Sequence, residues 1–155
     1  MIKIMFICHG NICRSPMAEY IMKDIVKKNG QENEFHIESC ATSSEEIFMG
    51  VGNPVYPPAK RKLAEAGISC EGKRAKKLSR DDYEKFDYLI CMDDNNIRNA
   101  LYILGDDKQG KLSKLLDWSG SGRGVADPWY SRDFDSAFND ILSGCTALFE
   151  KLKNS

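Results

Sequence analysis

The residues best suited to chemistry lie near the amino terminus, where five residues separate Cys8 from Arg14 and Ser15 follows directly. A guanidinium is a planar fork that can bind two oxygens of one phosphate group. A cysteine that faces the same anion site is favoured as its thiolate, which is the nucleophilic form. We therefore expect the Cys8 thiolate to attack a bound oxyanion while Arg14 holds the oxygens of that group.

The backbone of this segment is predicted to form the rest of the anion site. Gly10 and Asn11 are residue types that tolerate a left-handed backbone. A short loop that leads into a helix also directs several N–H groups to one point. We expect Ser15 to cap that helix and to donate a hydrogen bond to Cys8. The predicted phosphate-binding loop comprises His9, Gly10, Asn11, Ile12, Cys13 and Ser15.

A strand and a helix are expected to hold this loop. Residues 2–7 form a short apolar run that is typical of a buried strand. A helix is predicted from Ser15, with Pro16 at its first position, to a stop near Gly30. Further strands are predicted at 35–40, 88–92 and 111–116. Further helices are predicted at 57–66, after Ser79, at 94–104 and at 134–152, with a flexible loop at 119–124.

Strands that alternate with helices indicate an α/β fold, in which helices cover both faces of a parallel sheet. We predict a single domain over residues 1–155, with a sheet of about four strands. In such folds, ligands bind beyond the carboxyl ends of the strands. The loop after the first strand is therefore in position to bind phosphate.

Composition argues against several classes of protein. The formal net charge of −1 lacks the basic excess of a nucleic-acid binder. No apolar run approaches the roughly 18 to 20 residues of a membrane span, and the apolar stretch at residues 2–8 is too short for a signal peptide. We therefore expect a cytoplasmic protein with no nucleic-acid partner and no membrane partner.

The six cysteines are not spaced for a metal site or for a disulfide framework. A zinc site requires closely paired cysteines or histidines, and the two histidines, His9 and His36, lack such partners. In a reducing compartment, most of these thiols are expected to be small buried hydrophobic groups. No metal and no cofactor are expected.

Residues 8–19, CHGNICRSPMAE, resemble the signature of the low-molecular-weight protein tyrosine phosphatases. Residues 86–93, FDYLICMD, resemble that family's third strand and the start of the following loop, and residues 126–130, ADPWY, resemble its acid loop. These motifs span nearly the whole chain. The resemblance implies a metal-independent enzyme that hydrolyses phosphotyrosine in proteins, and small aryl phosphates, through a phosphocysteine intermediate. Inorganic phosphate would be its product and an inhibitor.

The resemblance also implies roles for residues of the acid loop. Asp127 matches the family aspartate that protonates the leaving phenol oxygen and then acts as a base toward water. A positioned acid of this kind typically contributes roughly 10²–10⁴-fold to the rate. Trp129 and Tyr130 match the aromatic residues that line the slot for the substrate ring.

Within the phosphate-binding loop, two further roles follow from the same resemblance. Asn11 matches the residue that holds the loop in shape through hydrogen bonds, with Ser15 and Ser39 as the expected partners. Cys13 matches a second loop cysteine. It is predicted to form a reversible disulfide with Cys8 under oxidising conditions, which would protect the nucleophile from further oxidation.

The sequence departs from the family pattern at two places. Residues 42–57 are longer than the family's usual segment, which carries an aromatic wall of the substrate slot. Either Phe48 or Ile47 is expected to serve as that wall. The family also often has a histidine near the position of Gly72, where it supports the phosphate-binding loop, and this chain has none there.

Two related enzyme classes and one binding class are alternatives. A phosphoarginine phosphatase resembles this loop with threonine at the position of Ile12, and an apolar Ile12 favours an aryl phosphate. An arsenate reductase needs further redox cysteines close together, whereas Cys70 and Cys91 lie 21 residues apart. A phosphate-binding module without activity would be expected to lack a member of the predicted catalytic set, Cys8, Arg14 and Asp127.

Overall fold

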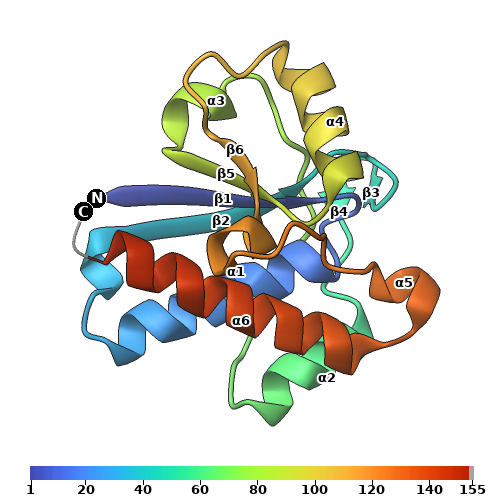
Figure 1. Cartoon of the computed structure of the whole chain (residues 1–155). Helices are drawn as coiled ribbons and strands as arrows, with labels where there is room; N and C mark the ends of the chain where they lie inside the picture. The colour runs from blue at the N-terminus through green and yellow to red at the C-terminus, as the bar shows by residue number, and fades with distance from the viewer. Residues whose placement is uncertain (154–155) are drawn as a thin grey trace.

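The computed structural model describes residues 1–153, and at its centre lies a parallel sheet of four strands in the order β2-β1-β5-β6 (Figure 1). The strands are β1 (Ile2–Cys8), β2 (Phe35–Ala41), β5 (Tyr88–Cys91) and β6 (Leu112–Lys114). The predicted fold class and strand number are confirmed. The strand predicted at 111–116 is shorter than expected, because the chain turns at Leu115 into the 3-10 helix η2 (Leu115–Ser119).

Helices cover both faces of the sheet, with α1 and α6 on one face and α3 and α4 on the other (Figure 1). Within residues 1–153, no helix has the length and apolar character needed to cross a membrane. The helices are α1 (Arg14–Lys28), α2 (Pro57–Glu65), α3 (Asp82–Lys85), α4 (Asp94–Leu104), α5 (Pro128–Ser131) and α6 (Phe134–Leu152), with the 3-10 helix η1 (Glu32–Glu34) before β2.

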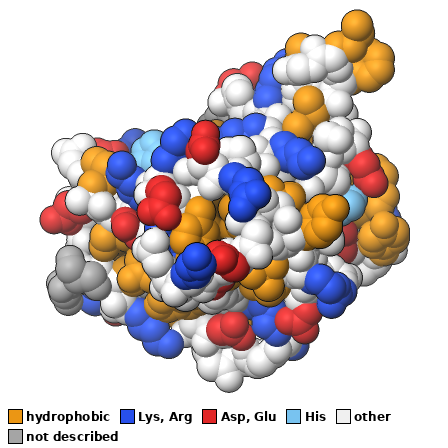
Figure 2. Space-filling view, turned by 90° about the horizontal axis from the view of Figure 1, so that it is seen from above, with side chains coloured by type: hydrophobic (Ala, Val, Ile, Leu, Met, Phe, Trp, Pro, Cys, Tyr) orange, Lys and Arg blue, Asp and Glu red, His pale blue; other side chains and the backbone are white. Residues whose placement is uncertain are grey.

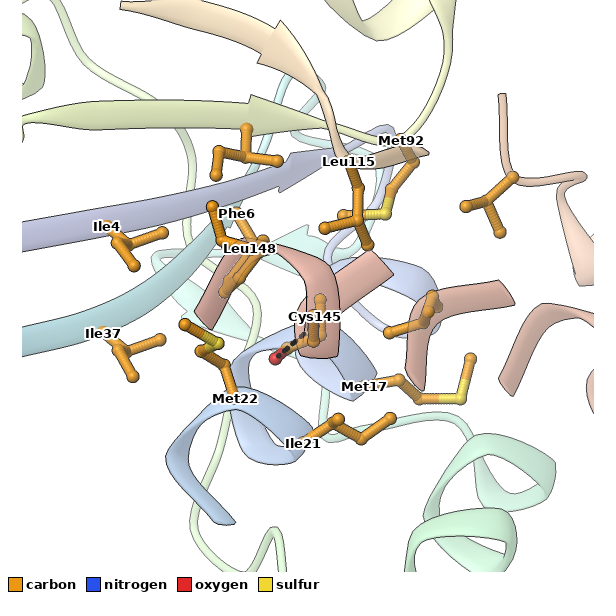
Figure 3. Close-up of a cluster of buried hydrophobic side chains, with 14 of the residues drawn as sticks. Ile4, Phe6, Met17, Ile21, Met22, Ile37, Met92, Leu115, Cys145 and Leu148 are labelled. Atoms are coloured by element: carbon orange, nitrogen blue, oxygen red, sulfur yellow. Dashed lines mark hydrogen bonds between the residues drawn. The ribbon is translucent and has the colours of Figure 1, made fainter. Parts of the chain in front are cut away.

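The central strand β1 is apolar on both faces because both are buried. Ile4 and Phe6 belong to the core between the sheet and the pair α1 and α6, which Figure 3 shows in detail. Met5 and Ile7 point to the opposite face and join the core beneath α4. Burial on both sides fixes the position of the carboxyl end of this strand, which carries Cys8.

Two helix starts differ from the sequence prediction. Helix α1 begins at Arg14, and no side chain caps it, because the Ser15 hydroxyl binds elsewhere. The short helix α3 has Asp81 at its cap position, whereas Ser79 lies outside it and donates its backbone N–H to the Asp82 carboxylate. Ser15 is bound by a hydrogen bond to another element, and Ser79 by a local one to Asp82, so neither serine takes the cap position that the local pattern predicts.

A short antiparallel hairpin, β3 (Ile47–Phe48) and β4 (Val51–Gly52), was not predicted. It turns at Met49 and Gly50, which have φ of 51° and 81°. Its base is fixed against residues 74–75, because Ala75 donates its backbone N–H to Asn53. A Cβ on Gly52 would lie 1.9 Å from the Ala75 carbonyl oxygen, so this close approach requires glycine.

Candidate active site

The loop at residues 9–13 joins the end of β1 to the start of α1 and forms the floor of a pocket. The pocket opens beyond the carboxyl ends of the parallel strands, where this fold class is expected to bind ligands. Its walls come from the segment before β3 and from the start of α5. The lining residues are Cys8, His9, Gly10, Asn11, Ile12, Cys13, Arg14, Glu45, Glu46, Asp127, Trp129 and Tyr130.

The Cys8 thiol is buried at the base of the pocket and has two polar neighbours from α1. The Ser15 hydroxyl oxygen lies 2.9 Å from the Cys8 sulfur, and the Ser15 backbone N–H donates to the same sulfur over 3.4 Å. Both groups can donate to a thiolate. The amino-terminal end of α1, which carries the positive end of the helix dipole, lies beside the same sulfur.

A chain of buried hydrogen bonds surrounds the Ser15 hydroxyl. Asn11, with φ of 60°, donates its side-chain N–H groups to Ser15 over 2.8 Å and to Ser39 over 2.9 Å. The Ser39 hydroxyl in turn donates to Glu19 over 2.6 Å. Because Ser15 accepts from Asn11, its own hydrogen is available for Cys8 at 2.9 Å or for the Cys40 carbonyl oxygen at 3.4 Å. The contacts of Asn11 with Ser15 and Ser39 are the expected ones.

Glu19 ends this chain in a buried ion pair that the sequence did not indicate. Its carboxylate lies 3.3 Å from the Lys73 ammonium, and both side chains are almost fully buried. Lys73 also donates to the Ser39 carbonyl oxygen over 2.9 Å. Lys73, the residue after Gly72, therefore supports the loop through Glu19 and Ser39.

The Arg14 guanidinium is buried and held from two sides. One nitrogen, Nη1, donates to Asp93 over 2.7 Å and to the Val125 carbonyl oxygen over 2.8 Å. The other, Nη2, contacts Asp127 at 3.4 Å. Burial lowers the pKa of Arg14, but the negative charges of Cys8, Asp93 and Asp127 outweigh it and raise the pKa. The guanidinium is therefore a fixed cation beside the sulfur.

Asp127 lies at the cap position of α5, opposite Cys8 across the pocket. One carboxylate oxygen accepts the Trp129 backbone N–H over 3.0 Å, and the other faces Arg14. The carboxylate is partly exposed, so it can meet a group that enters the pocket. A thiol, a guanidinium and a carboxylate from three segments thus converge on one anion site.

A family model described as low molecular weight phosphotyrosine protein phosphatase matches residues 3–155. The chain belongs to this family. The low molecular weight protein-tyrosine-phosphatase YfkJ of Bacillus subtilis is 34% identical over 155 residues, which cover 99% of this chain and 97% of that protein. The low molecular weight phosphotyrosine protein phosphatase of Gallus gallus is 32% identical, covering 96% of this chain and 94% of its own.

Solved structures of the same family have the same fold. The crystal structure of YfkJ gives a TM-score of 0.93 and covers 99% of this chain and 96% of its own. That of SP-PTP, the low molecular weight protein tyrosine phosphatase from Streptococcus pyogenes, gives 0.86 at 35% identity, covering 98% of this chain and 93% of its own. The arrangement of strands and loops around the pocket is therefore that of a low-molecular-weight phosphatase.

The aromatic residues of this phosphatase occupy one wall of the pocket. Trp129 is partly exposed, packs on Tyr56 with ring centroids 4.9 Å apart, and lines the pocket with the exposed Tyr130. Phe48, the other residue expected in the slot, does not line it and is 76% exposed on the hairpin. Ile47 points inward and packs against Ile12 and Cys13 beneath the loop. Glu45 and Glu46 form the wall on that side.

The second loop cysteine lies in an environment that keeps it protonated. Burial, together with the negative charges of Cys8 and Asp127, raises the pKa of Cys13 to about 12. All six cysteines are free thiols in this structure. The disulfide between Cys8 and Cys13 stays a prediction. Within residues 1–153, no group of three or more acidic, histidine or cysteine side chains is placed to hold a metal ion.

Sequence reasoning missed three polar residues of this site. Asp93 orients Arg14, and Glu19 and Lys73 support the loop from below. Asp93 was visible only as the last residue of the 86–93 motif, and Glu19 only as part of the loop signature. An acidic residue at the carboxyl end of a strand beside the loop is the signal that points to Asp93.

Proposed function

We propose that this protein hydrolyses phosphotyrosine in proteins, and small aryl phosphates, through a phosphocysteine intermediate. The observation that supports this most is the convergence of Cys8, Arg14 and Asp127 on one pocket with a backbone anion loop at its floor. A thiolate, a fixed guanidinium and a carboxylate are the three groups that phosphate transfer to sulfur requires. Family membership supports the same reaction.

In the first step, the Cys8 thiolate attacks phosphorus and a sulfur–phosphorus bond forms. The bond between phosphorus and the tyrosine oxygen breaks, and Asp127 transfers its proton to that oxygen. Arg14 and the loop N–H groups bind the three other oxygens, on which charge is spread in the transition state. The products of this step are tyrosine and the phosphocysteine.

In the second step, water attacks phosphorus and Asp127 accepts a proton from it. The sulfur–phosphorus bond breaks, inorganic phosphate forms, and Cys8 leaves as a thiolate. The two donors from Ser15 stabilise that leaving sulfur. The pocket that binds the product is the one that binds the substrate, so inorganic phosphate is expected to inhibit by competition.

Aryl phosphates are favoured over phosphoarginine as substrates. Trp129 and Tyr130 provide aromatic surface along the path out of the pocket, which suits a phenyl ring. Ile12 adds an apolar group at the loop position where the phosphoarginine type has threonine. We propose that the enzyme works in the cytoplasm, without a metal or cofactor, on phosphotyrosine-containing proteins.

The decisive experiment measures hydrolysis of para-nitrophenyl phosphate in EDTA, beside phosphotyrosine and phosphoarginine, with Cys8→Ser as the control. Turnover of the aryl esters that vanishes in Cys8→Ser supports the proposal. Rapid-quench trapping of labelled phosphate on the protein would identify the covalent intermediate. Turnover that survives in Cys8→Ser, or that is faster with phosphoarginine, contradicts it.

A further inference from the structure

The β3–β4 hairpin carries an apolar surface that the fold itself does not use. Phe48 is 76% exposed, Met49 88% and Val51 58%. The hairpin lies at the same end of the molecule as α5, beyond the carboxyl ends of the strands (Figure 1). Figure 2 shows hydrophobic side chains on a projection on that side of the molecule. We call Phe48, Met49 and Val51 the hairpin tip.

Met49, at the turn of the hairpin, combines an unfavourable backbone conformation with an exposed apolar side chain. Met49 has φ of 51°, in the left-handed region that residues other than glycine and asparagine rarely adopt. Its side chain contributes no burial to the core. A strained position with an exposed apolar side chain gives no benefit to folding. A contact between the Met49 side chain and another molecule would account for this arrangement.

The hairpin is fixed relative to the phosphate-binding loop, so its tip is held at a defined place. Ile47 packs against Ile12 and Cys13 of the loop. Arg74 donates to the Gly52 carbonyl oxygen over 3.0 Å. The hairpin that carries the tip follows directly on Glu46, which lines the mouth of the pocket.

An unpaired carboxylate lies between the loop and the hairpin tip. Glu46 lines the pocket, and its Cγ is 3.3 Å from where a Cβ on Gly10 would be. Within residues 1–153 it has no ion-pair partner, and its one polar contact is a 3.4 Å hydrogen bond from Asn53. Its neighbour Glu45 faces His9 at 2.9 Å. The hairpin side of the mouth is thus acidic.

We propose that this surface binds the polypeptide of the phosphotyrosine substrate, with a basic residue next to the phosphotyrosine at Glu46 and an apolar residue at the hairpin tip. The inference rests on the proposed function, because the phosphotyrosine must occupy the pocket. A chain that leaves the pocket toward the hairpin meets a carboxylate first and apolar side chains next. Charge complementarity selects the first residue, and burial of apolar surface selects the second.

The test compares three phosphotyrosine peptides of equal length, beside para-nitrophenyl phosphate. One has arginine on both sides of the phosphotyrosine and leucine beyond, the second has aspartate in place of arginine, and the third has serine in place of leucine. We expect kcat/KM to be highest for the first peptide. Glu46→Gln should reduce the ratio of the arginine to the aspartate peptide by roughly two- to fivefold, and added salt should reduce it likewise.

Two matched variants separate docking from folding. Met49→Gly is compatible with the left-handed backbone, so it keeps the hairpin and removes only the side chain. It should raise KM for the leucine peptides by roughly threefold, with kinetics on para-nitrophenyl phosphate unchanged. Tyr102→Ser, at a side chain that is 90% exposed on α4, is the control for apolar loss. Glu84→Gln, whose carboxylate also accepts one 3.4 Å amide hydrogen bond, is the control for charge loss.

Equal kcat/KM for all three peptides, or equal effects of the variants and their controls, would overturn the docking surface alone. A wild-type protein with no turnover of para-nitrophenyl phosphate would overturn the proposed function and this inference together. Sedimentation measurements test the remaining possibility, that the tip binds a second copy of the chain. If Met49→Gly dissociates a dimer and leaves peptide kinetics unchanged, the tip binds a second copy of the chain, and the inference is wrong.

Discussion

The Arg132 guanidinium donates a 3.0 Å hydrogen bond to the Tyr56 hydroxyl. Arg132 ends α5, with φ of 59°, and its guanidinium lies over the rings of Tyr56 and Trp129 at 5.4 and 5.9 Å. Tyr56 donates its backbone N–H to the Ile12 carbonyl oxygen over 2.9 Å. One contact therefore joins the segment that carries Asp127 to the phosphate-binding loop.

Replacement of Arg132 should loosen the acid loop without disturbing the nucleophile. In Arg132→Gln, we expect kcat/KM for phenyl phosphate to fall by roughly threefold or more, since cation–aromatic contacts of this kind contribute modest energies. Turnover of para-nitrophenyl phosphate, whose leaving group needs less help from an acid, should change less. Arg98→Gln, at an exposed position on α4, is the control. Equal losses on both substrates would indicate a purely structural role.

Asp127→Ala should show a stronger form of the same selectivity. Without the acid, the leaving oxygen departs as a phenolate, and the loss depends on the basicity of that phenolate. We expect kcat/KM to fall by roughly 10²-fold or more for phenyl phosphate and by much less for esters of acidic phenols. The measurement is a plot of log kcat/KM, which reports the step in which the phenol leaves, against the pKa of the leaving phenol. An unchanged slope in the variant would show that Asp127 is not the acid.

Asp93→Asn should weaken the hold on Arg14 while it keeps the helix start intact. Asp93 accepts the Asn96 backbone N–H at the start of α4, and asparagine is an equally good cap. The charge that orients the guanidinium is lost. We expect kcat/KM for para-nitrophenyl phosphate to fall by roughly tenfold and inorganic phosphate to inhibit less. A melting temperature close to wild type would exclude unfolding as the cause.

The parts of the site that sequence could predict are those in which one short segment does the chemistry. The loop from Cys8 to Arg14 needs only its own residues and a helix start to form an anion site. Asp127 was assigned by resemblance, because nothing in its local sequence separates it from other loop aspartates. Where a residue's role depends only on local backbone geometry, a sequence motif is enough to locate it.

The residues that were missed or misplaced depend on contacts between distant segments. Ser15 was expected both to cap the helix and to donate to Cys8, and in the structure its hydroxyl lies beside Cys8 but does not cap α1. Lys73 looks like part of a charged run, and only the fold brings it to Glu19. The turn at Met49 lacks the asparagine or aspartate that usually marks a hairpin turn, so the hairpin was not predicted. Phe48 was assigned to the pocket wall by resemblance to the family's aromatic segment.

Alkylation should distinguish Cys8 from the other five cysteines. The pKa of Cys13 is raised to about 12 by burial and by its negative neighbours, so at pH 7 it is almost wholly protonated. Burial also raises the pKa values of Cys40, Cys70, Cys91 and Cys145. We expect one equivalent of iodoacetamide at pH 7 to modify Cys8 alone, with loss of activity and protection by inorganic phosphate. Peptide mapping by mass spectrometry measures this, and equal labelling of Cys13 would contradict it.

Two opposing effects on stability act at Gly144, where α6 packs against η2. Replacing Gly144 by alanine inside a helix would by itself stabilise the protein by about 1 kcal/mol. However, a Cβ on Gly144 would lie 2.6 Å from Cγ of Leu115, which is fully buried. Overpacking of this kind costs about 1–3 kcal/mol. The clash should therefore outweigh the helix preference.

Gly144→Ala is accordingly expected to lower the free energy of unfolding by up to about 2 kcal/mol, the difference between these two effects. Urea titration followed by circular dichroism measures it, and activity per folded molecule should be retained because the contact lies away from the pocket. Gly122→Ala, where a Cβ meets nothing within 4 Å, is the matched control and should be close to neutral. A Gly144→Ala protein more stable than wild type would show that α6 shifts to relieve the clash, and that the packing beneath the sheet is looser than these distances indicate.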